Sequence, residues 1–373
     1  MKIILIINDD TFRIIYMEKI NVIDLFAGVG GLSYGFAHNE NFEIIMANEY
    51  DPDIAKAYSL NHPSVEMVNC DIKDLTAEII KKHTGGKKID LLVGGPPCQS
   101  YSTLGKRQMD DRANLFKEYC RVLTIVQPKA FIFENVTGLL SMQGGKLFPL
   151  IQEEFKKLGY NLKHQVLNAA NFGVPQFRER VILVGTKEEN TFIYPEPTHG
   201  DLLLGKPFVT VCDALSSLPI LKSGESSKAY LSGPQNEFQR FVQDTEIIEE
   251  NDAPNNGAHL IRIMEALPDG GDKNDLPEDI RPKSGYGNTY AKMWWHRPAP
   301  TITRNFACPS SSRCIHPRDS RAMTTREGAR LQSFPDSYKF YGSRQTKNLE
   351  IGNALPPLLS IALAKQMVKF FKK

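Results

Sequence analysis

The sequence predicts an α/β protein built on a doubly wound sheet, with a smaller irregular part placed after it. Short β-branched runs alternate with helical patterns over the first half of the chain, and a glycine-rich turn follows the first of these runs. After Gly185 the composition becomes rich in Pro, Ser, Asn and Asp. The chain has 373 residues, more than the roughly 250–300 residues at which a single core stops growing. We therefore expect two structural parts.

The first half contains six runs that we expect to be strands and four segments with helical periodicity. The expected strands are 21–25, 42–47, 90–93, 130–133, 162–168 and 180–184, and the expected helices are 31–38, 52–60, 114–127 and 146–158. This alternation is typical of βαβ units, so we expect a parallel sheet. Ligands of such sheets bind beyond the carboxyl ends of the strands, and the chemically active side chains should directly follow them.

The chain divides into four segments. They are a preface, 1–16; the sheet-bearing domain, 17–186; the irregular domain, 187–320; and a C-terminal segment, 321–373. The preface is either a start assigned too early or an extra edge strand. In the last segment we expect a helix at 325–332, a turn at 334–336 and an amphipathic helix at 356–371, which should pack back on the first domain.

The bulk composition excludes several classes of protein. Hydrophobic residues make up 41% and charged residues 24% of the chain, as in ordinary globular proteins. No apolar stretch approaches the roughly 20 residues of a membrane span, so we expect no membrane partner. Six cysteines are scattered without a CxxC pair and no secretory leader is recognisable, which favours a reducing cytoplasm.

The net charge of +2 hides an uneven distribution. Residues 241–280 contain eleven Asp and Glu against two Lys and Arg, whereas residues 281–330 contain ten Lys and Arg against two acidic residues. The basic stretch is a candidate phosphate-facing surface. The alternative is a solvated charged face that pairs with the acidic stretch before it.

The first expected strand ends in DLFAGVGGLSYGF, residues 24–36, a glycine turn at a strand-to-helix junction. Such a turn suits a dinucleotide, a nucleoside or a tight turn without a ligand. Glu49 follows the second strand, about 20 positions downstream, where a carboxylate can accept hydrogen bonds from ribose hydroxyls. Tyr50 can stack on a base, and Asp71 is a third polar candidate; an exposed carboxylate pair is the alternative for Glu49 and Asp71.

Two reactive side chains follow neighbouring strands. Cys98 lies in GGPPCQSYS, residues 94–102, on a stiff Gly/Pro turn, and Glu134 ends the next strand in FENVTG. A turn cysteine flanked by backbone amides is placed for thiolate chemistry, although many turn cysteines are inert. Their arrival at the same edge of the sheet favours a reactive role for both.

Two arginines alternate along the extended entry to the last strand of this half. Arg178 and Arg180 lie two residues apart in QFRERVILVG, so both side chains can point to one side. Such a pair suits a phosphate, a polar base edge or structural salt bridges.

Taken together, these segments resemble the cytosine-C5 DNA methyltransferases of prokaryotic restriction-modification systems. The resemblance rests on seven motifs in order, from residue 24 to residue 357: DLFAGVGGL, NEYD, GGPPCQSYS, ENVTGL, QFRERVILVG, REGARLQSFPD and IGNALPP. One such motif is weak evidence, but seven in order are specific. The resemblance implies a Rossmann-like fold that uses S-adenosylmethionine, and it makes the irregular domain the target-recognition domain.

The resemblance also assigns roles to residues. The cofactor pocket is implied to contain Phe26, Gly28, Gly30, Glu49, Tyr50, Asp71, Ile72, Pro96, Leu115 and Asn353. Catalysis is assigned to Cys98 as the nucleophile at carbon 6 of cytosine, with Glu134 at the ring N3, Arg180 at O2 and Arg178 beside it. No metal is needed for any step. S-adenosylhomocysteine is the implied product of the cofactor.

The implied partner is double-stranded DNA, from which the target base is swung out. Gln99 and Ser102 begin a loop, containing Lys106 and Arg107, that we expect to close on DNA. The stretch 281–305 mixes basic residues, including Arg297 and Arg304, with Tyr286, Tyr290, Trp294 and Trp295; these aromatics suit DNA contact or a small core equally well. Cys308, Cys314 and His316 have a loose metal-like spacing, but no fourth ligand is evident.

Other classes of function remain open. A tRNA-methylating branch of the family shares these motifs, and a catalytically silent relative would bind DNA or regulate a partner. A nicotinamide dehydrogenase would explain the glycine turn but not Cys98 or Glu134. We expect a monomer in a prokaryotic cytoplasm that works independently of any cognate restriction endonuclease; the DNA sequence it recognises does not follow from the residues.

Overall fold

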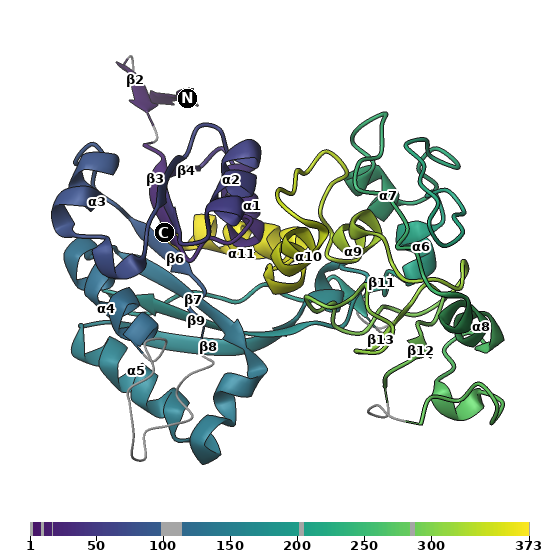
Figure 1. The fold of residues 1–373 in the computed structure, drawn as a ribbon. Helices are drawn as coiled ribbons and strands as arrows, with labels where there is room; N and C mark the ends of the chain where they lie inside the picture. Colours follow the sequence, from purple (N-terminus) through teal and green to yellow (C-terminus); the bar gives the residue numbers. More distant parts are fainter. Residues whose placement is uncertain are drawn as a thin grey trace.

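The computed structural model describes residues 3–8 and 11–16 by their backbone alone, together with residues 18–97, 114–200, 205–283 and 288–372. Figure 1 shows two lobes. One lobe contains the main sheet and its helices, and the other contains the elements from α6 (Val211–Leu215) to β13 (Arg313–Ile315). Between them lie α9 (Thr325–Leu331) and α10 (Arg344–Asn353).

The main lobe contains a seven-stranded sheet in the order β5-β4-β3-β6-β7-β9-β8. Its strands are β3 (Ile20–Leu25), β4 (Phe42–Glu49), β5 (Glu66–Asn69), β6 (Leu91–Gly94), β7 (Ala130–Val136), β8 (Asn161–Asn168) and β9 (Glu179–Thr186). The six strands expected from the sequence are confirmed, and β5 is an addition. The chain runs outward from β3 to β5 and then returns to place β6 on the other side of β3, which creates a topological switch point.

The expectation of a wholly parallel sheet is wrong at one strand. The strands from β5 to β7 pair in parallel, but β9 pairs antiparallel with both β7 and β8. The reason is the short connection from β8 to β9, which contains a 3-10 helix, Ala169–Phe172, and no crossover helix. A parallel return needs a dozen or more residues, usually with a helix, so the chain makes a hairpin instead.

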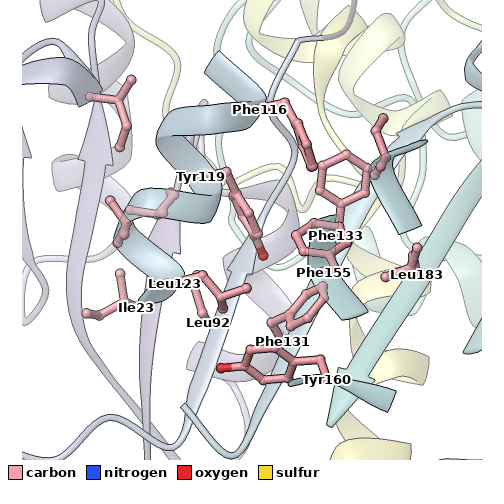
Figure 2. Packing of buried hydrophobic residues seen from close by; sticks show 14 of the residues in the cluster. Ile23, Leu92, Phe116, Tyr119, Leu123, Phe131, Phe133, Phe155, Tyr160 and Leu183 are labelled. Carbon is pink, nitrogen blue, oxygen red and sulfur yellow. The ribbon is translucent and has the colours of Figure 1, made fainter. Parts of the chain in front are cut away.

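Helices cover both faces of the sheet. They are α1 (Gly31–Ala37), α2 (Pro52–Asn61), α3 (Ala77–His83), α4 (Asn114–Val126), α5 (Leu147–Lys157) and α11 (Pro357–Phe371). On one face, Tyr119 of α4 and Phe155 of α5 pack among strand residues that include Phe131 and Phe133, as Figure 2 shows. On the other face, α1 and α11 form a second core. The expected C-terminal helix therefore does return to the first domain, 325 residues after Gly35, whose amide donates to Ser360 Oγ at 2.9 Å.

The second lobe has little regular structure in its described residues. Its elements are β10 (His199–Gly200), β11 (Lys206–Pro207), α6, α7 (Glu237–Val242), α8 (Ala258–Ala266), β12 (Ala291–Lys292) and β13. Phe238, Val242 and Met293 pack with Phe334 and Phe340 from the C-terminal segment in a shared core. The lobe is therefore held to the rest of the chain by its interior as well as by its connections.

The residues before Ile20 form a separate hairpin. Strands β1 (Ile3–Asn8) and β2 (Thr11–Tyr16) pair only with each other among the described strands, so the preface is not an edge strand of the main sheet. Figure 1 shows this hairpin outside the main lobe. None of the described helices combines the length and the apolar character needed to cross a bilayer.

Part of the basic stretch is buried, so its full positive charge does not lie on a surface. Of its ten Lys and Arg residues, four are buried: Lys292, Arg321, Arg326 and Arg330. Arg330 donates to both oxygens of Asp336 and to the carbonyl of Ala214 at 2.9 Å. Arg326 donates to the carbonyls of Glu249, Pro335 and Tyr338. Buried cations with this many partners are structural.

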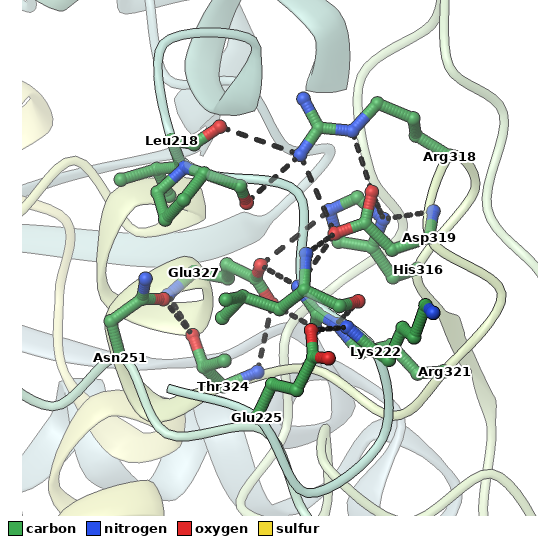
Figure 3. Close-up of polar contacts among 12 residues, drawn as sticks. Leu218, Lys222, Glu225, Asn251, His316, Arg318, Asp319, Arg321, Thr324 and Glu327 are labelled. Atoms are coloured by element: carbon green, nitrogen blue, oxygen red, sulfur yellow. Dashed lines mark hydrogen bonds and ion pairs between the residues drawn. The ribbon is translucent and has the colours of Figure 1, made fainter. Parts of the chain in front are cut away.

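A second buried network joins the irregular lobe to α9. Arg321 bridges Asp319 and Glu327, and its Nε donates to the carbonyl of Leu221 at 2.9 Å (Figure 3). His316 lies beside them: its Nδ1 accepts the backbone amide of Asp319 at 3.0 Å, which places the ring proton on Nε2. Burial lowers the pKa of His316 from 6.5 to about 4, so the ring is neutral in the folded protein.

We expect Arg330→Met to lower the free energy of unfolding by about 3–5 kcal/mol, because it leaves Asp336 buried without its cation. Urea unfolding of the variant and the wild type measures the difference. Arg262→Met is the matched control, since Arg262 pairs with Asp279 at a largely exposed position, and it should leave the midpoint unchanged. Equal midpoints for Arg330→Met and wild type would contradict the structural role.

We expect His316 to make the protein less stable as the pH falls below 6.5. The unfolded ring takes up a proton near pH 6.5, whereas the folded ring resists it until about pH 4, so protons favour the unfolded state in this window. The loss reaches about 3 kcal/mol by pH 4. Urea unfolding at several pH values should show a shallower decline for His316→Asn, while the exposed His259→Asn keeps the wild-type slope.

Candidate active site

A cavity of about 690 Å³ opens at the carboxyl ends of β3, β4, β6 and β7, beside the switch point of the sheet. Its volume is within the range of small-molecule and cofactor sites. The walls include the glycine turn after β3, the end of β4, the Gly95-Pro96-Pro97 turn after β6, Glu134 of β7, and the C-terminal end of α10. The sequence therefore predicted the edge of the sheet at which polar groups gather.

The glycine turn after β3 is ordered by hydrogen bonds to Glu49. Phe26 and Gly28 both have positive φ angles, 54° and 56°, which let the chain turn sharply out of the strand. The amide of Gly28 donates to Glu49 Oε2 at 2.9 Å. The turn and the carboxylate at the end of the neighbouring strand thus fix each other.

Glu49 is oriented toward the cavity by three backbone amides. Besides Gly28, the amides of Tyr50 and Asp51 donate to its Oε1 at 2.9 and 3.1 Å. Burial raises the pKa of Glu49, and these hydrogen bonds oppose the rise. Tyr50, with 72% of its surface exposed, lies next to it on the cavity wall. A fixed carboxylate beside an open aromatic ring suits a ribose and its base.

Glu134 and Arg180 form an ion pair on another wall of the cavity. Arg180 Nε lies 2.8 Å from Glu134 Oε1, and both side chains are largely buried. Burial raises the pKa of Glu134, and the charge of Arg180 opposes the rise. Gly95 packs against this pair so closely that a Cβ atom there would lie 2.6 Å from Glu134 Oε2. Asn135 Nδ2 donates to the carbonyl of Pro96 at 2.9 Å and so holds the Pro turn.

Arg178 lies outside the described cavity wall, and its assignment to catalysis stays a prediction. Its guanidinium is buried and donates to the carbonyls of Ile302, Gly352 and Ala354 at 2.8–2.9 Å. It does not line the cavity formed by the described residues. The spacing of Arg178 and Arg180 in an extended segment allows both side chains to point to one side. In the structure, carbonyl groups from segments distant in the sequence accept the hydrogen bonds of Arg178.

Nine of the ten predicted cofactor residues line the cavity in the described part of the chain: Phe26, Gly28, Glu49, Tyr50, Asp71, Ile72, Pro96, Leu115 and Asn353. Gly30 is the exception. It has a φ of 95°, and a Cβ atom there would lie 2.5 Å from His62 Nε2, so this glycine is needed for packing behind the turn.

The predicted nucleophile, Cys98, and the loop residues Gln99, Ser102, Lys106 and Arg107 lie outside the described residues. Pro97, which directly precedes Cys98 in the sequence, lines the cavity. Of the predicted DNA contacts, Arg304 is exposed and lines the same cavity, and Arg297 is exposed on the second lobe.

The aromatic residues near Arg297 divide between two environments. Tyr286 lies outside the described residues, and Tyr290 packs on a small core. The ring of Trp294 lies under Arg313 and near Arg297, with distances of 4.2 and 5.5 Å from ring centre to guanidinium carbon. Trp295 packs against the core shared with α9. Trp294 is thus the described aromatic residue of this stretch that is associated with an exposed arginine.

The loose metal-like spacing of Cys308, Cys314 and His316 does not become a cluster in the described residues. Cys314 is buried, donates to the carbonyl of Cys308, and has its pKa raised by burial to about 12. His316 instead lies with Asp319 and Glu327, whose ligand atoms are within 4.8 Å of one another. Arg321 pairs with both of these carboxylates, so the group is already neutralised by a cation.

Sequence reasoning missed several polar residues on the cavity walls, among them Asp24, Asn135 and Glu350. Asp24 is the penultimate residue of β3, and burial raises its pKa to about 7. Asn135 directly follows Glu134, and Glu350 directly precedes IGNA. Their adjacency to recognised motifs was the available signal.

The fold and the site together define a class of enzyme: a doubly wound α/β protein with a nucleoside-type cavity and a buried Glu–Arg pair at the strand ends. The comparison with protein families narrows this class. Residues 20–369 match the family of C-5 cytosine-specific DNA methylases. The chain belongs to this family.

Curated relatives and solved structures agree. The chain is 35% identical over 360 residues to the Type II methyltransferase M1.HphI of Haemophilus parahaemolyticus, covering 95% of this chain and 88% of the relative. It is 33% identical over 377 residues to M.DdeI of Desulfomicrobium norvegicum, covering 94% and 89%. A crystal structure of a candidate DNA modification methyltransferase from a prophage of E. coli aligns with a TM-score of 0.76 and 26% identity, covering 95% of this chain and all of that one. The Dnmt2 methyltransferase of S. pombe, 20% identical with a TM-score of 0.56 and covering 94% and 99%, shares the fold.

Proposed function

We propose that this protein transfers the methyl group of S-adenosylmethionine to carbon 5 of cytosine in a specific duplex DNA sequence, with Cys98 as its covalent nucleophile. The observation that carries the proposal is the Glu134–Arg180 pair, which lies in the same cavity as Glu49 and beside the Gly/Pro turn that leads to Cys98. A pyrimidine-binding pair and a ribose-binding carboxylate thus share one site. This arrangement, in a chain of this family, favours methyl transfer to a base.

The residues of the cavity fit S-adenosylmethionine, which supplies an electrophilic methyl group on a sulfonium. Glu49 is placed to accept the ribose hydroxyls, Tyr50 to stack on the adenine, and Asp71 with Ile72 to border its edge. The walls contain five carboxyl groups, Asp24, Glu49, Asp71, Glu134 and Glu350, against the cations Lys73, Arg180 and Arg304. A nicotinamide dehydrogenase would leave Cys98 and the Glu134–Arg180 pair without a role, which argues against that alternative.

The chemistry of cytosine explains the types of residue. Carbon 5 is a poor nucleophile until the Cys98 thiolate adds to carbon 6, which pushes electrons through the ring toward N3 and O2. Glu134, whose pKa is raised by burial, would donate to N3, and Arg180 would donate to O2. Carbon 5 then takes the methyl group. Loss of the carbon 5 proton to a base and elimination of the thiol restore the aromatic ring and free Cys98.

The DNA-facing surface is proposed to lie around the mouth of the cavity. Arg304 lies at its rim. Arg297 is exposed on the second lobe, beside the half-buried ring of Trp294. The loop that contains Gln99, Ser102, Lys106 and Arg107 would close over the target base after it leaves the helix. We expect the protein to act as a monomer. A cognate endonuclease, where present, would act independently in the same bacterial cytoplasm.

The test is transfer of tritium from methyl-labelled S-adenosylmethionine to duplex DNA or to total tRNA, with 5-methylcytosine mapped by sequencing. We expect label in DNA at one sequence. Cys98→Ser should abolish transfer, because its hydroxyl is a far weaker nucleophile. Glu134→Gln should slow it by about 10²–10⁴-fold, because the amide cannot supply the proton at N3. Cys308→Ser, at an exposed cysteine, should keep wild-type activity.

The same assay separates the alternatives. Label in tRNA alone would make the protein a tRNA methyltransferase. Cofactor binding without transfer to either polymer would make it a catalytically silent relative. Transfer that survives Cys98→Ser would exclude the covalent route.

A second prediction concerns the ribose. Glu49→Ala should weaken the binding of S-adenosylhomocysteine by about 10–100-fold, because it removes a charge-assisted acceptor and releases the glycine turn. Isothermal titration calorimetry measures the affinity. Glu43→Ala is the matched control on the same strand, since Glu43 is half-exposed and pairs with Lys87. Unchanged affinity in Glu49→Ala would refute the assignment.

A further inference from the structure

Glu350 is a buried carboxyl group that faces the cavity without a partner that would account for its burial. Its surface is 2% exposed, it lines the cavity, and neither of its oxygens accepts a hydrogen bond of normal geometry among the described residues. The backbone amide of Tyr341 is near enough only to moderate its pKa. Leaving a carboxyl group in this state is costly, so proteins rarely keep one away from a site of ligand binding.

No described cation forms an ion pair with Glu350. Lys347, on the same helix, donates to Glu250 at 2.7 Å, and its charge opposes the rise in the pKa of Glu350 only in part. Asp51 and Asp53 approach from the N-terminus of α2, and their charges add to the effect of burial, which raises the pKa of Glu350 to about 9. Tyr338 is also close, but its hydroxyl donates to the carbonyl of Val29 at 2.6 Å. Glu350 therefore has no positively charged partner of its own among the described residues.

The place of Glu350 on the cavity wall indicates which part of the cofactor would lie next to it. It lies on α10, three residues before Asn353, so both side chains are on one face of the helix and both line the cavity. The proposed ribose and adenine residues, Glu49 and Asp71, come instead from the strand side. Of the two cationic groups of S-adenosylmethionine, the sulfonium has no proton to donate, whereas the α-ammonium has three and matches a carboxylate.

We propose that Glu350 binds the α-ammonium group of the cofactor's methionine end and gives up its own proton when it does so. This inference rests on the proposed function, because it takes S-adenosylmethionine as the ligand. When the ammonium binds, the carboxyl O–H bond breaks, the proton leaves to solvent, and the carboxylate accepts hydrogen bonds from the N–H groups of the ammonium. Glu350 is thus a binding residue whose charge appears only with its ligand.

The test uses the full-length protein and isothermal titration calorimetry at about pH 6.5, where a free α-amino group of pKa about 8 is protonated. S-adenosylhomocysteine is one ligand, and its analogue without the α-amino group is the other. We expect Glu350→Gln to bind S-adenosylhomocysteine about 10–100-fold more weakly than wild type. Titration in buffers of different ionisation enthalpy should show that wild type releases about one proton more per ligand than this variant.

Two controls separate binding from a structural role. The analogue without the amino group should bind to wild type and Glu350→Gln with equal affinity, and Glu350→Asp, which keeps a carboxyl group, should keep the proton release. Thermal unfolding without ligand should show Glu350→Gln at least as stable as wild type, because it removes a buried group without a partner. Glu43→Gln should behave as wild type throughout.

The inference is overturned if Glu350→Gln binds S-adenosylhomocysteine with wild-type affinity and proton release, or if the analogue is weakened as much as S-adenosylhomocysteine. These outcomes leave the proposed function intact. A wild-type protein that binds neither S-adenosylhomocysteine nor S-adenosylmethionine would overturn the proposed function as well, so the two failures are distinguishable.

Discussion

The arrangement of this molecule depends on buried arginines that donate to backbone carbonyls. Arg178 joins the entry of β9 to Ile302 in one lobe and to Gly352 and Ala354 beside α10. Arg326 and Arg330 do the same for the segments around Glu249 and Ala214. A hydrogen bond from a charged donor contributes about 1.5–3 kcal/mol, and each guanidinium makes several. These contacts close the cavity, because they fix α10 and the 302–304 segment opposite the strand ends.

The cavity itself combines two kinds of wall. The strand side presents groups held by backbone amides and glycine turns, as Glu49 is by Gly28. The helical side presents Glu350 and Asn353 from a segment more than 300 residues later in the chain. Pocket polarity is therefore set jointly by local turn geometry and by long-range packing, and the buried pair of Glu134 and Arg180 lies where these walls meet the Pro turn.

Much of the fold could be predicted because the sequence pattern of a long amphipathic or β-branched segment indicates which of its residues are buried. β5 was missed because its four residues carry too little periodicity. The antiparallel β9 was missed because strand direction depends on the connection, not on the strand. Motifs located most of the cavity, but the adjacency of Glu350 to a motif does not show that its side chain faces the cavity. The environment of each basic residue in 281–330 could not be predicted, because charge alone does not distinguish an arginine facing solvent from one, such as Arg330, that donates to buried acceptors.

The contacts of Arg178 have an evolutionary consequence. A carbonyl oxygen is present at every residue, whatever its side chain, so a guanidinium that holds a loop by its carbonyls places almost no demand on that loop's amino-acid identity. Substitutions in the irregular lobe can therefore change its surface side chains while its attachment to the main lobe through Arg178 is kept. Substitutions of side chains near Ile302 would likewise leave the contact that Arg178 makes with the main chain in place.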